Sequence, residues 1–129
     1  MTLRRLLLVF AGGSIGTAMR LAIGLWMPDE GGIPLATLLV NVVGSLLIGV
    51  LAARLPSTAE MRVFLGTGVL GGFTTYSAFM TGTIALWAAA PLLAFAYAAG
   101  SLVLGLAAAA AGLVIGRPRG SGRPTGADS

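Results

Sequence analysis

The residues of this chain best suited to chemistry are amide and hydroxyl side chains set inside long apolar stretches. Asn41 stands between Thr37 and Ser45 at intervals of four residues, which places all three on one face of a helix. Tyr97 and Ser101 repeat that interval later in the chain. An amide is too polar to face lipid without partners, so Asn41 indicates a pore or binding role. For the hydroxyls, packing across a helix interface is the alternative.

A second polar segment, Gly71-Gly72-Phe73-Thr74-Thr75-Tyr76-Ser77-Ala78-Phe79, interrupts the apolar stretch from Val63 to Ala90. Two adjacent glycines are costly in a helix, and hydroxyls can bond to backbone groups that a break sets free. In hydrocarbon, non-helical backbone is tolerated only where it is buried in protein or lines a cavity. We therefore predict a helix broken near its middle, at an ion or substrate site.

The composition requires these residues to be carried by membrane helices. Hydrophobic residues make up 57% of the 129 positions and charged residues only 9%, which lies outside the range of a soluble globular domain. The apolar runs are long enough for helices of roughly 20 residues. The predicted fold is an all-α integral membrane protein with four transmembrane helices: Leu3 to Met27, Pro34 to Leu55, Thr58 to Ala90 with the break inside it, and Pro91 to Gly116.

The connections and helix surfaces carry further signals. Pro34 and Pro91 are placed like first-turn prolines, and Ser57-Thr58-Ala59-Glu60 matches a capping box. Three G-x-x-x-G pairs predict close helix packing: Gly12 with Gly16, Gly68 with Gly72, and Gly112 with Gly116. We expect residues 1–116 to form the membrane domain and residues 117–129 to be a disordered basic tail.

The acidic residues exclude several functions. Asp29, Glu30, Glu60 and Asp128 all fall outside the predicted membrane interior, and the chain has no His and no Cys. A proton-coupled antiporter usually carries its proton on an intramembrane carboxylate or His, so that class is disfavoured. The chain has no lysine and no phosphate-binding loop. We predict a protein that is not an enzyme and uses no nucleotide.

The net charge of +4 comes from arginines that flank the spans, which argues against nucleic acid as a partner. Seven of the eight basic residues fall on the side of the two termini: Arg4, Arg5, Arg54, Arg62, Arg117, Arg119 and Arg123. The positive-inside rule then predicts a multi-pass protein of the plasma membrane with both termini cytoplasmic. Arg20 lies inside the first span, where it either snorkels to the interface or lines a vestibule that attracts anions.

Three motifs in order resemble the Fluc (CrcB) fluoride channels, and the resemblance covers all four spans. They are Gly12-Gly13-Ser14-Ile15-Gly16-Thr17-Ala18-Met19-Arg20, Ala36-Thr37-Leu38-Leu39-Val40-Asn41-Val42-Val43-Gly44-Ser45, and Gly66-Thr67-Gly68-Val69-Leu70 followed by the Gly71 to Phe79 segment. The resemblance implies a passive channel in the lipid bilayer that exports fluoride and so confers fluoride resistance. It also implies an antiparallel, dual-topology dimer with a structural Na⁺ at its centre.

The resemblance also implies roles for individual residues. The backbone carbonyls of Gly71 and Thr74 would bind the Na⁺, and Arg20 would lie in the vestibule. The pore would be lined by Asn41, Thr75, Tyr76, Ser77, Phe79, Tyr97 and Ser101. Two positions depart from the family pattern: Tyr76 replaces the first phenylalanine of an aromatic pair, and Ala78 replaces a common hydroxyl residue.

The arginine bias bears on the assembly. A chain that inserts in both orientations should show almost no bias, so we expect a fixed orientation and an oppositely oriented homologous subunit, with a homodimer as the alternative. Two other functions stay open: a small secondary transporter, and a non-conducting partner subunit of a heterodimeric channel.

Overall fold

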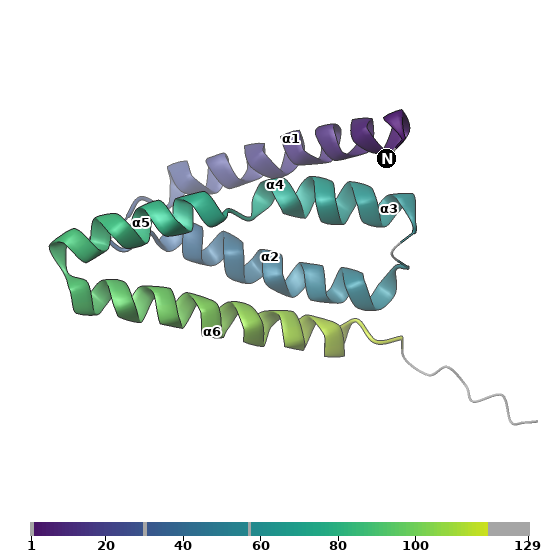
Figure 1. The fold of residues 1–129 in the computed structure, drawn as a ribbon. Coiled ribbons are helices and arrows are strands. Elements are labelled where there is room, and N and C mark those ends of the chain that lie inside the picture. Colours follow the sequence, from purple (N-terminus) through teal and green to yellow (C-terminus); the bar gives the residue numbers. More distant parts are fainter. Residues whose placement is uncertain (1, 30, 57, 119–129) are drawn as a thin grey trace, which may run out of the picture.

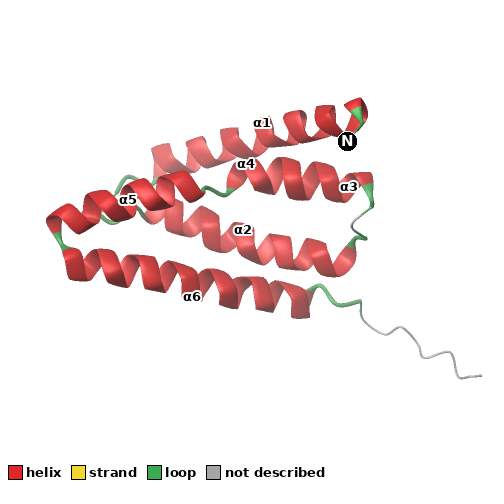
Figure 2. Cartoon of the chain, in the orientation of Figure 1, coloured by secondary structure: helices red, strands yellow, loops and turns green. Residues whose placement is uncertain are grey.

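A computed structural model describes residues 2–29, 31–56 and 58–118 and builds them into a bundle of helices (Figures 1 and 2). The elements in chain order are α1 (Leu3–Trp26), α2 (Leu35–Arg54), α3 (Glu60–Arg62), the π-helical stretch η1 (Val63–Leu70), α4 (Gly71–Phe73), α5 (Tyr76–Ala89) and α6 (Pro91–Ile115). Counting Glu60–Ala89 as one interrupted span, four helices are long and apolar enough to cross a membrane. The predicted all-α class and the four spans are confirmed.

Two of the predicted helix starts differ in the structure, at Pro34 and at the start of the third span. Pro91 opens α6 as a first-turn proline, but Pro34 is the N-cap of α2 and therefore lies one residue outside that helix. The predicted capping box is wrong. The third span begins at Glu60 after Ala59, which makes no side-chain capping bond, and the Glu60 carboxylate is paired with Arg4 at 3.0 Å. Ser57 lies outside the described residues.

The first half of the broken span packs along α1 (Figure 1). Glycines make this contact close: a Cβ atom added at Gly12 would lie 2.5 Å from the Phe64 carbonyl oxygen and 2.9 Å from the Gly68 Cα. A Cβ atom added at Gly72 would overlap the Gly13 carbonyl oxygen. Only glycine allows two helix backbones to approach this closely, so the G-x-x-x-G pair of α1 and the pair formed by Gly68 of η1 and Gly72 of α4 form one interface, as predicted.

The second half of the broken span packs on α6, and α6 packs on α2 (Figure 1). Leu86 of α5 is buried together with Ala94 and Tyr97 of α6. At the other end of α6, added Cβ atoms at Gly112 and Gly116 would overlap or crowd the α2 backbone around Val50. The break thus lets one span contact α1 with its first half and α6 with its second.

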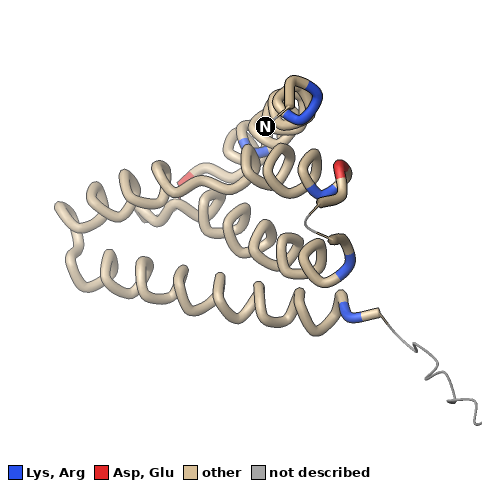
Figure 3. Tube along the Cα trace, turned by 45° about the vertical axis from the view of Figure 1, so that its right-hand side comes forward, with Lys and Arg blue, Asp and Glu red and all other residues tan. Residues whose placement is uncertain are grey.

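The outer surface suits a bilayer. Leu25, Trp26 and Leu92 are each at least 86% exposed, as expected of side chains that face lipid tails rather than water. Figure 3 shows most of the basic positions, in blue, at the end of the bundle that carries the N-terminus. In the chain, Arg4 and Arg5 stand in the first turn of α1, Arg54 in the last turn of α2 and Arg117 just after α6, whereas Asp29 stands in the loop between α1 and α2. The predicted separation of charge is therefore present among the described residues; Glu30, Asp128, Arg119 and Arg123 lie outside them, as does the tail from residue 119.

Candidate functional site

The break lies at Thr74 and Thr75, whose backbones are extended, with φ/ψ of −81°/158° and −149°/122°. It lies within the predicted segment, but the two glycines are not the break itself. Gly71 has helical angles of −62°/−38°, and both glycines belong to α4. Gly72 is needed for a different reason, because a Cβ atom there would also lie 2.9 Å from the Thr17 hydroxyl on α1. Close packing, not helix breaking, requires this glycine.

The break is held by Asn41 on α2. Its side-chain Nδ2 donates to the Thr75 carbonyl at 2.9 Å, and the Thr75 N–H donates to Asn41 Oδ1 at 2.8 Å. In a continuous helix that N–H would donate to the carbonyl of Gly71. The Thr75 hydroxyl then accepts from the Ala78 N–H at 3.1 Å and caps α5. Asn41 therefore ends one helix, and Thr75 begins the next.

Side chains of α1 donate hydrogen bonds to the carbonyl end of the first half of the broken span. The Gly72 carbonyl accepts hydrogen bonds from Arg20 Nε at 3.2 Å and from the Thr17 hydroxyl at 3.4 Å. Arg20 thus makes a specific bond rather than snorkelling freely. Thr17 was not predicted as a site residue, although its spacing of three residues from Arg20 places both on one helix face.

A cavity of about 390 Å³ lies beside the break, between α2, α5 and α6. Asn41 and Ser45 line it from α2, and Ser101 and Gly105 line it from α6. Part of each predicted polar track therefore lines this cavity. Its remaining lining comes from the break and from apolar positions: Thr74, Thr75, Tyr76, Phe79, Ile48, Leu102, Leu106 and Ala109.

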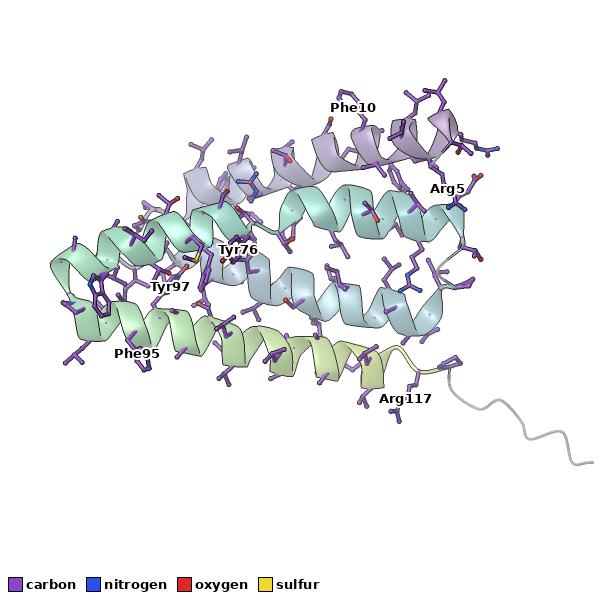
Figure 4. All side chains as sticks on the ribbon, in the orientation of Figure 1. Arg5, Phe10, Tyr76, Phe95, Tyr97 and Arg117 are labelled. Atoms are coloured by element: carbon purple, nitrogen blue, oxygen red, sulfur yellow. The ribbon has the colours of Figure 1, made fainter. Side chains whose placement is uncertain are left out.

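Three aromatic rings run from the break toward α6. The ring centroids of Tyr76 and Phe79 are 6.3 Å apart at 40°, and those of Phe79 and Tyr97 are 5.7 Å apart at 32°. Figure 4 shows Tyr76 at the start of α5 and Tyr97 on α6. Tyr76 is 74% exposed whereas Tyr97 is buried. The aromatic series therefore begins at the protein surface and ends in its interior.

Two hydroxyl groups at the inner end of this series have at most each other as partners among the described residues. The Tyr97 hydroxyl and Ser101 Oγ are buried one turn apart on α6, close enough to interact with each other, and neither is bonded to any other residue that the structure describes. Buried hydroxyls in proteins are nearly always bonded, to protein or to a bound species. Ser101 lines the first cavity together with Phe79, and the ring of Tyr97 lies against that of Phe79.

A second cavity of about 410 Å³ approaches the break from the side of α1. It is lined by Arg20, Thr37 and Thr75 together with Leu21, Gly24, Leu25, Ala36, Val40 and Ala78. Thr37 therefore lines a different cavity from Asn41 and Ser45, although the three residues were predicted to form one polar track. Thr75 lines both cavities, so the break forms part of the wall between them.

The remaining predicted residues lie at the break itself. Ser77 Oγ is 3.3 Å from Thr75 Oγ1, and Ser77 is exposed at the first turn of α5. Gly71 is exposed on the first half-helix, and Thr74 bonds back to the Leu70 carbonyl through its N–H and its hydroxyl. Within the described ranges no three Asp, Glu, His or Cys side chains cluster, so the donors available to a cation here are carbonyl and hydroxyl oxygens.

The fold and the site together define a multi-pass helical membrane protein with a cavity on each side of a broken span, each lined mainly by apolar residues and by a few polar side chains. Such a break, lined by hydroxyl, amide and aromatic groups, is typical of proteins that pass small solutes across a membrane.

Comparison with known proteins identifies the family. Residues 7–113 match the model of the CrcB-like protein, Camphor Resistance (CrcB) family. The chain is 47% identical over 117 residues to the fluoride-specific ion channel FluC of Agrobacterium fabrum, covering 85% of this chain and 94% of the relative. It is 45% identical to FluC of Rhizobium meliloti, covering 89% and 98%, and 42% identical to FluC of Thermus thermophilus, covering 90% and 96%. The chain belongs to the CrcB/FluC family of fluoride-specific ion channels, which are not enzymes.

Proposed function

We propose that this protein is a subunit of a fluoride-selective channel that lets fluoride leave the cytoplasm down its gradient and so lowers its toxicity. Family membership supports the proposal, since the curated relatives are fluoride-specific ion channels. The observation in this chain that carries it is the pair of buried hydroxyls of Tyr97 and Ser101, which bond to no other described residue and lie near the ring of Phe79. A small anion is the acceptor that such donors lack.

The chemistry of the cavity suits fluoride. A small, strongly hydrated anion must exchange water for protein donors to enter, and it must not be bound so tightly that it cannot leave. Amide and hydroxyl donors meet both conditions because they carry no full charge. Aromatic ring edges are weakly positive and add attraction without trapping the ion. We place fluoride between the hydroxyl track of α6 and the rings of Tyr76 and Phe79, with Arg20 lining the vestibule.

We infer further that the carbonyls of Gly71 and Thr74 hold a structural Na⁺. The support is local: the N–H of Thr75, which would bond to the Gly71 carbonyl in a continuous helix, donates to Asn41 instead. Carbonyl oxygens released at a break are hard donors suited to an alkali cation. When bound, the ion would neutralise the carbonyl dipoles that converge at the break.

We propose that the functional unit is an antiparallel dimer in the plasma membrane. The 74% exposure of Tyr76 supports it, because an aromatic pore residue needs cover from a partner. The arginines at one end support a fixed orientation with cytoplasmic termini, and a homologous subunit of opposite orientation as the partner. Labelling the termini of the chain expressed alone tests this: labelling on one side is expected, and equal labelling of both sides would favour a homodimer.

The function is tested by fluoride and chloride efflux from liposomes that hold the purified chain, alone and with a paired homologue. Fluoride efflux without chloride efflux is expected. Chloride passing as readily as fluoride would refute selectivity, and efflux coupled to a proton or sodium gradient would indicate a secondary transporter. Fluoride efflux carried wholly by the homologue would make this chain a non-conducting partner.

A further inference from the structure

The Gly72 carbonyl is the point where α1 holds the broken span. In an unbroken helix this carbonyl would accept the N–H of Tyr76, but the extended backbone at Thr74 and Thr75 separates the two. Arg20 Nε and the Thr17 hydroxyl donate to it instead, at 3.2 and 3.4 Å. Two donors from a neighbouring helix thus replace the bond that the break removes.

The packing around this carbonyl leaves the donors little freedom to shift. Gly72 lies against α1 so closely that an added Cβ atom would be 2.9 Å from Thr17 Oγ1, and one added at Gly16 would be 2.8 Å from the Phe73 N. Thr17 and Arg20 lie three residues apart on the face of α1 that bears Gly16 and packs against Gly72. The contact is therefore built into the helix interface.

The charge of Arg20 suits this place. Residues 60–73 form one continuous helical half-span, and its carbonyl end lies at the break. The carbonyl end of a helix carries a partial negative charge that a cation stabilises. A guanidinium can donate through Nε and still present its other N–H groups elsewhere, which an ammonium on a flexible stem does not do in the same geometry.

We propose that Arg20 is a positioning residue that closes the carbonyl end of the first half-span and so keeps Thr75 in its place between the two cavities. This role goes beyond attraction of anions to the vestibule, and it rests on the proposed channel function. Arg20 lines the second cavity with Thr37 and Thr75, and Thr75 lines the first cavity with Asn41. Loss of the Arg20 bond would let the wall between the cavities move.

The substitutions Arg20→Lys and Arg20→Gln separate the two roles. If Arg20 only attracts anions, Lys should preserve flux, and Gln should raise the half-saturating fluoride concentration at low salt but not at high salt. If Arg20 positions the break, both variants should lower the maximal flux about tenfold or more at every salt concentration, since the lost bond has a charged donor. Arg54→Lys, at the end of α2 far from the break, is the control and should conduct normally.

A second readout does not depend on conduction. Hydrogen exchange at the amides of Thr75 and Ala78, which bond to Asn41 and to Thr75, should speed up about tenfold or more in both Arg20 variants. Exchange in the middle of α6 should not change. Retained flux and retained protection in Arg20→Lys would overturn the proposal. If the wild-type chain passes no fluoride either alone or with its paired homologue, the channel function is refuted, while the exchange result still decides the role of Arg20.

If neither Arg20 variant folds, Thr17→Val provides a second test of the contact at the Gly72 carbonyl. It keeps the shape of the side chain and removes only the weaker bond to Gly72. We expect faster hydrogen exchange at the Thr75 amide and unchanged exchange in the rest of the bundle. Unchanged hydrogen exchange at Thr75 would contradict the proposal.

Discussion

Asn41 pairs with the backbone of Thr75 through both polar atoms of its amide, in hydrogen bonds of 2.9 and 2.8 Å. Asn41 lies on α2 and Thr75 lies in the break, so this pair ties the broken span to its neighbour. The same side chain lines the 390 Å³ cavity. Asn41, which the sequence predicts to line a pore, therefore also fixes the extended backbone of Thr75 at the break.

Replacing Asn41 should damage both the fold and the flux. In Asn41→Leu the Thr75 N–H and carbonyl lose their partners inside the bundle, which we expect to cost about 2–4 kcal/mol of stability. Thermal unfolding in detergent and fluoride efflux measure the two effects. Ser45→Ala is the matched control, because that hydroxyl lines the same cavity but bonds only to the Asn41 carbonyl of its own helix. Equal losses of stability and of fluoride efflux in both variants would contradict the role of Asn41 in fixing the break.

Phe79→Ile should abolish most fluoride flux while leaving the protein folded and assembled. The isoleucine side chain keeps much of the volume but has no electropositive ring edge to offer an anion. Fluoride efflux and size-exclusion chromatography are the measurements. Phe95→Ile is the control, since Phe95 is 68% exposed on the outer face of α6 and should tolerate the same exchange. Normal flux in Phe79→Ile would remove this ring from the pathway.

Tyr97→Phe and Ser101→Ala should lower flux without lowering stability. Each removes a buried hydroxyl whose single neighbouring partner among the described residues is the other hydroxyl of the pair. Losing such a poorly satisfied buried group costs little hydrogen bonding and can stabilise the fold. We expect unchanged or higher melting temperatures together with slower fluoride efflux. A fall in melting temperature with normal efflux would show that these hydroxyls serve packing instead.

Gly16→Ala should disrupt the contact between α1 and the broken span. The added methyl would overlap the Val69 carbonyl oxygen, and overpacking of this kind typically costs about 1–3 kcal/mol or more. Gly24→Ala on the same helix is the control, because nothing lies within 4 Å of a Cβ atom there. That variant should be neutral or slightly stabilised by the better helix propensity of alanine. The difference between the two melting temperatures is the measurement.

Removing sodium should destabilise the assembled protein if Gly71 and Thr74 bind it. A ligand present at a hundred times its dissociation constant stabilises the folded state by about 2.7 kcal/mol. We expect a lower melting temperature when sodium is replaced by a large organic cation at constant ionic strength. Readdition of sodium, but not of a further organic cation, should restore it. A melting temperature indifferent to sodium would argue against a cation at the break.

Much of the architecture follows from local sequence. The four spans are long apolar runs that only helices can carry through hydrocarbon, and their observed ends lie within a few residues of the predicted ones. The polar tracks of α2 and α6 follow from helical periodicity, and Asn41, Ser45 and Ser101 from these tracks line one cavity. The start of the third span lies two residues from the predicted one, but its cap differs: Ser57-Thr58-Ala59-Glu60 has the letters of a capping box, whereas Ala59 is the N-cap and Glu60 pairs with Arg4.

The place and the cause of the break were decided by tertiary contacts. The double glycine indicated the right segment, but Gly72 serves the close approach of α1, and the chain breaks at Thr74 and Thr75. Sequence determines which side chains carry hydrogen-bond donors and acceptors and which are small enough for close packing, since these are properties of single residues. It does not determine that the N–H of Thr75 turns to Asn41 or that Arg20 reaches Gly72, because such partners are chosen only when distant helices pack together.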